Sequence, residues 1–138
     1  MPDIQGLVEG GRLPPRHYKV DQAIVNRYAQ VSGDHNPLHT DAAFAATTMF
    51  GRTIAHGMMT LCFLSDSLEV WAGDAWSRTG ELDVSFLAPV YPDDTVTVSL
   101  EVTGLEEGRF VCAVECAVGE RKVMAGQASI AGATGQND

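Results

Sequence analysis

Residues 57–71 read Gly-Met-Met-Thr-Leu-Cys-Phe-Leu-Ser-Asp-Ser-Leu-Glu-Val-Trp, and this stretch decides how the rest of the chain must pack. It predicts a helix about 22 Å long, at 1.5 Å per residue, and the apolar side chains of its first two turns point in almost every direction. A helix that is apolar all round is buried, so another element must wrap around it.

The second half of the chain predicts the element that wraps the helix. Residues 81–86 and 95–103 alternate polar and apolar side chains, which is typical of strands that lay one face on a core. Turn residues then lead to predicted strands at 109–118 and 121–131, and an edge strand is expected near 15–20. The residues expected to face the core are Leu82, Val84, Phe86, Val96, Val98, Leu100 and Val102. The pattern therefore predicts an α+β fold in which an antiparallel sheet curls about the long helix.

The first half of the chain predicts two shorter helices. One runs from Asp21, a typical N-cap, to Gly33, a typical helix stop, and the other can begin at Thr40 or Asp41. The apolar residues of the first helix recur at i, i+4 and i+7 and are Ile24, Tyr28 and Val31. With 138 residues we expect a single domain over 1–138, with a frayed Gly-rich tail at 132–138.

Composition and charge exclude several classes of protein. Hydrophobic residues are 45% of the chain, which is too apolar for a disordered protein, and the net charge of −9 argues against nucleic-acid binding. We see no leader sequence and no apolar run near the ~20 residues that cross a bilayer, so we expect a cytoplasmic protein with no membrane contact. The basic residues that could bind an anion are Arg52, Arg78, Arg121 and Lys122, although solvated surface charge is the favoured interpretation of each.

The three cysteines do not form a disulfide framework. Their number is odd, and Cys112 and Cys116 lie on one predicted strand with Cα atoms about 13 Å apart, too far for a bridge. We expect both to be buried thiols.

Residues 33–39 hold the residues with the clearest chemistry. Asp34 and His39 lie five apart across Asn36-Pro37, and Pro37 predicts that the segment is a bent loop and not a helix. His35 and His39 are spaced like metal ligands on a helix, but the proline between them destroys that common face, so we expect no metal. A carboxylate and an imidazole can instead act together on a water as acid and base. The alternative is that Asp34 caps the turn and His39 caps or packs near the next helix.

The chain resembles the hydratase 2 or MaoC-like family, which includes the (R)-specific enoyl-CoA hydratases. The residues that carry the resemblance are Tyr28, Ser32-Gly33-Asp34, Asn36-Pro37-Leu38-His39, Phe44-Ala-Ala-Thr47 and Ile54-Ala-His56-Gly57-Met58. The resemblance implies a hotdog fold and a homodimer that takes an acyl-CoA thioester as substrate. It also implies that Asp34 and His39 activate a water that adds to a trans-2-enoyl-CoA, giving an (R)-3-hydroxyacyl-CoA. The reaction is reversible, and no metal or redox cofactor is implied.

Three further site residues follow from the same resemblance. Gly57 begins the buried helix, and its N–H could stabilise an enolate oxygen, although close packing of the helix on the sheet would also explain a glycine. Ser65 matches a serine near the site of related hydratases, but it could equally bond a backbone carbonyl. Asn36 is a candidate for substrate binding. His56 is expected to be structural and His35 exposed.

Other functions stay open on sequence alone. An acyl-CoA thioesterase would use the same fold and a carboxylate-activated water. The chain could also be one subunit of a heteromeric 3-hydroxyacyl-thioester dehydratase, or a module that only binds acyl thioesters.

Overall fold

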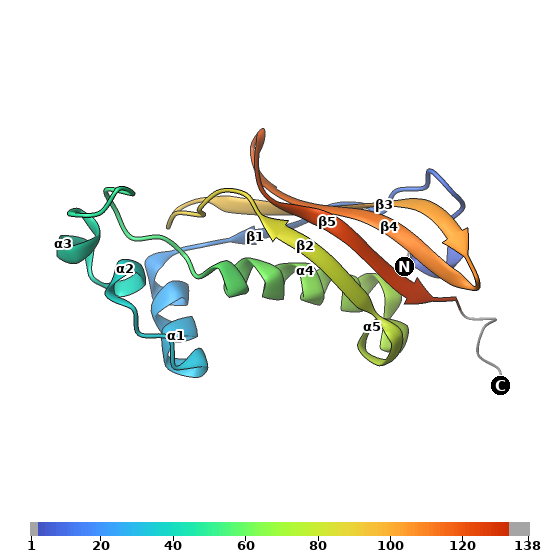
Figure 1. Ribbon diagram of the computed structural model, residues 1–138, viewed down its shortest axis with the longest axis horizontal. Coiled ribbons are helices and arrows are strands. Elements are labelled where there is room, and N and C mark those ends of the chain that lie inside the picture. Colours follow the sequence, from blue (N-terminus) through green and yellow to red (C-terminus); the bar gives the residue numbers. More distant parts are fainter. Residues whose placement is uncertain (1–2, 133–138) are drawn as a thin grey trace.

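A curved antiparallel sheet covers one long helix in the computed structural model, which describes residues 3–132 (Figure 1). The strand order is β1-β3-β4-β5-β2, and register shifts at Val102/Gly104 and Cys116/Ala117 add to the bend of the sheet. The strands are β1 (Arg16–Lys19), β2 (Glu81–Phe86), β3 (Thr95–Glu106), β4 (Arg109–Val118) and β5 (Arg121–Ala131). This architecture confirms the predicted α+β hotdog fold, and each predicted strand is present.

Helix α4 (Gly57–Ala72) lies beneath the sheet and supplies the centre of the core. Leu64 and Leu68 are fully buried against the inward side chains of β3, β4 and β5. The expectation that this helix is buried all round is wrong for a single chain, because Met58 is 53% exposed and Cys62 is also exposed. The sheet covers one side of α4 and leaves the opposite side open.

Three helices gather beyond the N-terminal end of α4, where they build the candidate site (Figure 1). They are α1 (Gln22–Ser32), α2 (Pro37–Thr40) and α3 (Ala42–Ala45). A 3-10 turn η1 (Ile4–Gly6) and a helix α5 (Asp74–Thr79), neither of which was predicted, complete the described part of the chain. The local signals for α5 were weak because it is short and none of its residues is buried.

Helix α1 has the predicted ends but not the predicted buried face. Asp21 Oδ1 accepts a hydrogen bond from Ile24 N at 2.8 Å, and Gly33 ends the helix with a φ of 79°. The buried residues are Val25 and Ala29, one position after the predicted stripe, whereas Val31 is 86% exposed. The helix docks on the core through Val25 and Ala29, so Ile24 and Val31 of the predicted stripe are exposed and Tyr28 is half-buried.

The proline in the candidate loop begins a helix instead of preventing one. Pro37 is the first residue of α2, a position that needs no backbone donor and suits the fixed φ of proline. Asn36 stays extended, and its Oδ1 accepts from Leu38 N at 2.9 Å, which caps the helix. The non-helical prediction is therefore correct for residues 33–36 and wrong for residues 37–39.

Phe86 and the chain end depart from the predicted pattern. The β3 residues of the predicted core face are buried, but Phe86 is 53% exposed at the end of β2, where its ring lies against Gly57 of α4. Gly132 N still donates to the Gly108 carbonyl at 2.8 Å, so the predicted frayed tail does not begin at residue 132. The rest of that tail, 133–138, lies outside the described residues.

Both cysteines of β4 are buried and unpaired, as predicted. Burial raises the pKa of Cys112 to about 11 and that of Cys116 to about 12. Among residues 3–132, no helix has both the length and the apolar character needed to cross a membrane.

Candidate active site

Asp34 and His39 meet where α1, α2 and the start of α4 converge, and the structure adds His56 to them. Each of these three residues brings one side-chain oxygen or ring nitrogen within 4.8 Å of the other two. Hydrogen bonds to oxygen are about 2.8 Å long, so a single water can contact two groups at this separation. The spacing therefore suits shared contact with one small molecule.

A backbone hydrogen bond fixes the proton of His39. Its Nδ1 lies 2.9 Å from the Ile54 carbonyl oxygen, which can only accept, so Nδ1 carries the hydrogen in this contact. Nε2 of the neutral ring is then left with a lone pair that can accept a proton. The segment before α4 thus orients the imidazole and selects its tautomer.

Short-range hydrogen bonds shape the loop that presents Asp34. Asp34 Oδ1 accepts from Asn36 N at 3.2 Å, and Asp34 N donates to Ser32 Oγ at 3.1 Å. The Asp34 carbonyl accepts from His56 Nε2 at 3.1 Å. The carboxylate thus helps to hold its own loop while its second oxygen makes no bond within the described chain.

His56 contacts both members of the pair and is 2% exposed. Its ring stacks on that of His39, with centroids 3.8 Å apart and planes 25° apart, and it donates to the Asp34 carbonyl. Burial lowers the pKa of His56, and the neighbouring His39 lowers it further, whereas the Asp34 carbonyl and charge act in the opposite direction. At neutral pH the His56 ring next to Asp34 and His39 is therefore uncharged. Its Nδ1 has no hydrogen-bond partner in the described chain.

The cluster of Asp34, His39 and His56 has the residue types of a metal site but not the ring geometry. A metal ion lies in the plane of each imidazole that binds it, about 2.0–2.1 Å from the nitrogen. The rings of His39 and His56 are stacked with centroids 3.8 Å apart and planes 25° apart, so an ion held by both would lie out of at least one ring plane. This arrangement is not the usual one for two imidazoles that share a metal ion.

Gln22 on α1 ties the His39 segment to the loop before α4. Its Nε2 donates to the His39 carbonyl at 2.8 Å, and its Oε1 accepts from Thr53 Oγ1 at 2.7 Å. Sequence reasoning missed this residue because it carries no motif and precedes His39 by 17 positions. Its position in the first turn of α1 was the only available signal.

Tyr28 of α1 lies next to His56 at the candidate site. Its ring lies 4.8 Å from that of His56, and burial raises its pKa, as do the neighbouring Cys62 thiol and the Asp34 charge. The hydroxyl therefore stays protonated at neutral pH and can donate. The resemblance included Tyr28, but no role had been predicted for it.

Gly57 lies at the start of α4, and no described residue accepts its N–H. A Cβ at this position would come within 3.3 Å of the Phe86 ring, so close packing is one reason for the glycine. A largely apolar cavity of about 250 Å³ opens beside it, lined by residues that include Phe50, Ile54, Thr60, Phe86 and Val90. Gly57, whose N–H is unpaired in the described chain, therefore borders a space that can hold an apolar chain.

The remaining candidates lie in different places. Asn36 is close to Asp34, but its side-chain oxygen is engaged as the cap of α2. Ser65 accepts from Trp76 Nε1 at 3.1 Å and lies eight residues after Gly57, about 12 Å along the helix. The structure therefore does not bring Ser65 to Asp34 and His39 of its own chain. His35 is exposed, as expected.

A sheet curved over one helix, with a carboxylate and two imidazoles gathered near the start of that helix, defines a hotdog-fold protein. The sequence matches the family described as the MaoC like domain over residues 3–124. The chain therefore belongs to the MaoC-like family, as the resemblance indicated.

Named relatives agree with this assignment. An (R)-specific enoyl-CoA hydratase of Aeromonas caviae is 43% identical over 88 residues, covering 63% of this chain and 65% of that protein, slightly under two thirds of its length. A 3-hydroxybutyryl-CoA dehydratase of Methylorubrum extorquens is 34% identical over 114 residues, covering 81% and 73%. The structure of an R-hydratase from Pseudomonas aeruginosa superposes with a TM-score of 0.79 at 32% identity, covering 91% of this chain and 82% of that one. These relatives are hydro-lyases by name, the enzyme class predicted from the sequence.

Proposed function

We propose that this protein hydrates trans-2-enoyl-CoA thioesters to (R)-3-hydroxyacyl-CoA thioesters, and catalyses the reverse dehydration. The observation that carries the proposal is the Nδ1 hydrogen bond from His39 to the Ile54 carbonyl. In the neutral ring it leaves Nε2 as a proton acceptor, and a ring nitrogen of His39 lies within 4.8 Å of an Asp34 carboxylate oxygen; activation of a water requires such a pair. The names of the hydratase and dehydratase relatives support the same chemistry.

The proposed reaction uses one water for both added groups. Asp34 accepts one hydrogen bond from the water and holds it, while His39 Nε2 takes the other hydrogen as a proton. The oxygen bonds to C3 of the enoyl group, and the double-bond electrons move onto the thioester oxygen as an enolate. His39 then returns the proton to C2, so that the atoms of one water are added and both residues regain their starting states.

The enolate oxygen needs a donor, and Gly57 is the proposed one. Its N–H is unpaired in the described chain and lies at the positive end of the α4 dipole. The absence of a side chain lets a thioester approach this N–H. The adjoining cavity beside Phe86 can hold the apolar part of the substrate.

The test uses purified protein and crotonyl-CoA, followed by loss of the enoyl absorbance and by chiral analysis of the product. We expect Asp34→Asn and His39→Gln each to lower kcat by about 10²–10⁴-fold, the usual contribution of a general acid or base. The matched controls are Asp83→Asn on the exposed face of β2 and His35→Gln in the same loop. Undiminished activity in both site variants would overturn the assignment.

The other functions predict different products or requirements. A thioesterase would release free CoA thiol, which a thiol reagent detects directly. A subunit of a heteromeric dehydratase would be inactive until its partner was added. Release of thiol without hydration would replace our proposal with hydrolysis.

We also propose a homodimer, because the single chain leaves apolar surface open. Helices α1 and α4 border a hollow of about 320 Å³ lined by Ile24, Tyr28, Val31, Met59, Cys62 and Phe63. A second copy would cover this surface. In its own chain Ser65 is too far along α4, so we assign it substrate contact only across such an interface. Light scattering on the purified protein measures the mass, and a monomer at assay concentration would contradict the dimer.

Two expectations from the sequence stay predictions. The first is a cytoplasmic location. The second is activity with no added metal or redox cofactor, which dialysis against a chelator before the assay will test.

A further inference from the structure

Arg52 differs from most basic side chains of this acidic protein in having no carboxylate partner. Within residues 3–132, the basic residues in ion pairs are Arg12, Arg16, Arg109, Arg121 and Lys122. One guanidinium nitrogen of Arg52 donates to the Pro92 carbonyl at 2.8 Å, and its remaining donors have no protein acceptor in the described chain. With a net charge of −9, an uncompensated guanidinium is a favourable place for an anion.

The guanidinium of Arg52, an exposed residue, lies over the ring of Tyr91. The Arg52 Cζ lies 4.8 Å from the centre of the Tyr91 ring, and the Arg121 Cζ lies 5.5 Å from the same ring. Arg121 is bound to Asp94 at 2.9 Å and to the Pro89 carbonyl at 3.3 Å, so its charge is largely compensated. A stacked arginine with free donors is pre-organised for the oxygens of a phosphate.

Arg52 and Tyr91 belong to two segments that also line the proposed substrate cavity. Ala55 N donates to the Val90 carbonyl at 2.7 Å, which joins the segment before α4 to the segment that carries Tyr91. Pro89 and Val90 line the cavity next to Gly57. Arg52 and Gly57 are five residues apart, so their Cα atoms are at most about 18 Å apart. A thioester at Gly57 can therefore extend an arm toward Arg52.

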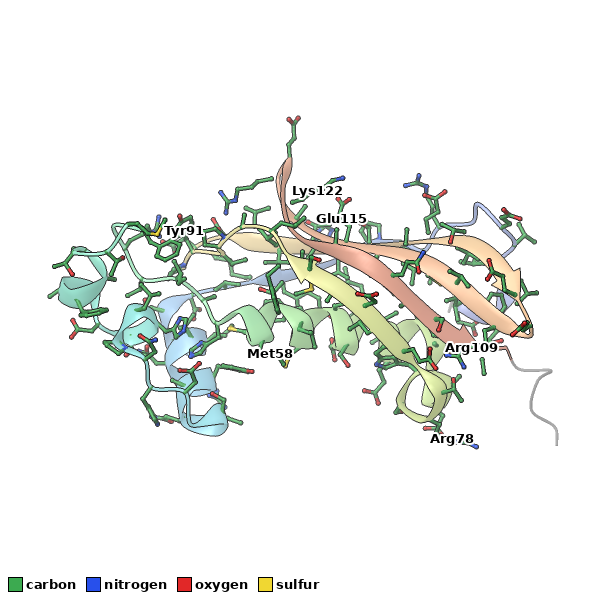
Figure 2. All side chains as sticks on the ribbon, viewed as in Figure 1. Met58, Arg78, Tyr91, Arg109, Glu115 and Lys122 are labelled. Carbon is green, nitrogen blue, oxygen red and sulfur yellow. The ribbon has the colours of Figure 1, made fainter. Side chains whose placement is uncertain are left out.

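Three other basic residues of the described chain also lack a carboxylate partner, and none of them lines the cavity. One is Lys19, the exposed last residue of β1, which pairs with Thr95 of β3. Figure 2 shows Tyr91 at the end of the molecule where α1, α2 and α3 gather, whereas Arg78 lies on α5 at the opposite end of α4. Arg27 lines the hollow between α1 and α4, on the surface assigned to the second copy. Arg52 is thus the unpaired cation that lies between two residues of the cavity lining, Phe50 and Ile54.

We propose that Arg52, stacked on Tyr91, binds a phosphate of the carrier arm of the thioester substrate. The inference rests on the proposed function, because that function supplies a thioester on a pantetheine arm. The phosphate can belong to CoA or to the phosphopantetheine group of a carrier protein, since both end the arm in phosphate esters. The arginine would bind this group and take no part in proton transfer.

The test compares substrates that differ only in their phosphates: crotonyl-CoA, crotonyl-phosphopantetheine and crotonyl-pantetheine. We expect Arg52→Gln to raise KM for crotonyl-CoA by about tenfold, the size of one charge-assisted contact, with kcat little changed. Activity on crotonyl-pantetheine, which has no phosphate, should be equal in both proteins, and this also shows that the variant is folded. The matched control is Arg78→Gln, with no change on any substrate, and Arg52→Lys should recover part of the affinity.

The phosphopantetheine arm identifies the phosphate. A penalty on both phosphorylated substrates assigns Arg52 to the phosphate next to the pantetheine, whereas a penalty on CoA alone assigns it to the nucleotide. Equal losses on all three substrates, or none, would overturn the proposal. If the wild type hydrates none of them, calorimetry with free CoA still tests Arg52, because weaker binding in Arg52→Gln supports the phosphate site even though the proposed function has failed.

Discussion

The rings of His39 and His56 lie stacked with their centroids 3.8 Å apart. The His56 ring is buried, and burial lowers its pKa so that it is neutral at neutral pH. His56 also donates to the carbonyl of Asp34. His56 therefore contacts both the imidazole of His39 and the backbone of Asp34, the two residues that we propose to activate water. Its own Nδ1 makes no bond in the described chain, so its polar contact is with the backbone of Asp34.

Replacing His56 separates its two contacts. His56→Phe keeps a ring stacked on His39 but loses the donor to the Asp34 carbonyl, and we expect kcat to fall about fivefold, since one hydrogen bond is worth about 1 kcal/mol. His56→Gln keeps a donor and should retain more activity. Steady-state kinetics and thermal melts measure both, with His35→Phe as the exposed control. A His56→Phe enzyme with the kcat of the wild type would exclude a positioning role.

Stability should depend on pH through His56. Burial lowers its pKa in the folded chain below the ordinary value of 6.5, so below that pH the unfolded chain binds this proton more readily. The stability gained by keeping His56 neutral is fully present above pH 6.5 and is lost as the pH falls through the pKa of His56 in the folded chain. We therefore expect a smaller loss of unfolding free energy between about pH 7.5 and about pH 5.5 in His56→Phe than in the wild type. Denaturant titrations at both values measure it, and an identical loss in the two proteins would contradict the prediction.

Gly57→Ala distinguishes packing from substrate approach. The added methyl would contact the Phe86 ring at 3.3 Å, and that ring is half exposed and can move. We expect a folded protein whose kcat/KM for crotonyl-CoA is lower by about 10²-fold, the scale of a lost oxyanion donor. The double variant Gly57→Ala with Phe86→Ala removes the ring contact. Recovery of activity in the double variant would show that the glycine serves only packing.

Two cysteines should resist modification in the native protein. Burial raises the pKa of Cys112 to about 11 and that of Cys116 to about 12, so at about pH 8 almost no thiolate is present at either. We expect a thiol reagent to modify at most one of the three cysteines before denaturation and all three after it. Cys62→Ala should then show no fast reaction, and modification of either β4 cysteine in the native state would contradict the burial.

The sequence predicted those features that depend on neighbouring residues. The alternation of polar and apolar residues predicted β3, because each inward residue is two positions from the next. Asp21 and Gly33 predicted the two ends of α1. The buried face of α1 could not be predicted, because Val25 and Ala29 are selected by where the helix docks. A proline at position 37 was ambiguous, since it breaks a helix from within but suits its first residue.

The candidate site was predictable only in part for the same reason. Asp34 and His39 lie five residues apart and within one motif. The contacts that hold them come from Gln22, Ile54 and His56, each 15 to 22 residues away from the residue that it contacts. Spacing carries no information about such contacts. The position of His56 directly before Gly57 was the available signal, and it had been interpreted as structural.

Helix α2 consists of one turn without a buried residue, yet it carries His39. A turn of this kind has little stability of its own, so its order depends on bonds to α1 and to the segment before α4. Thermal fluctuations can open this region while the sheet and α4 stay folded. We therefore expect hydrogen exchange to be faster at the His39 amide than in β4, and activity to disappear on heating before the sheet unfolds.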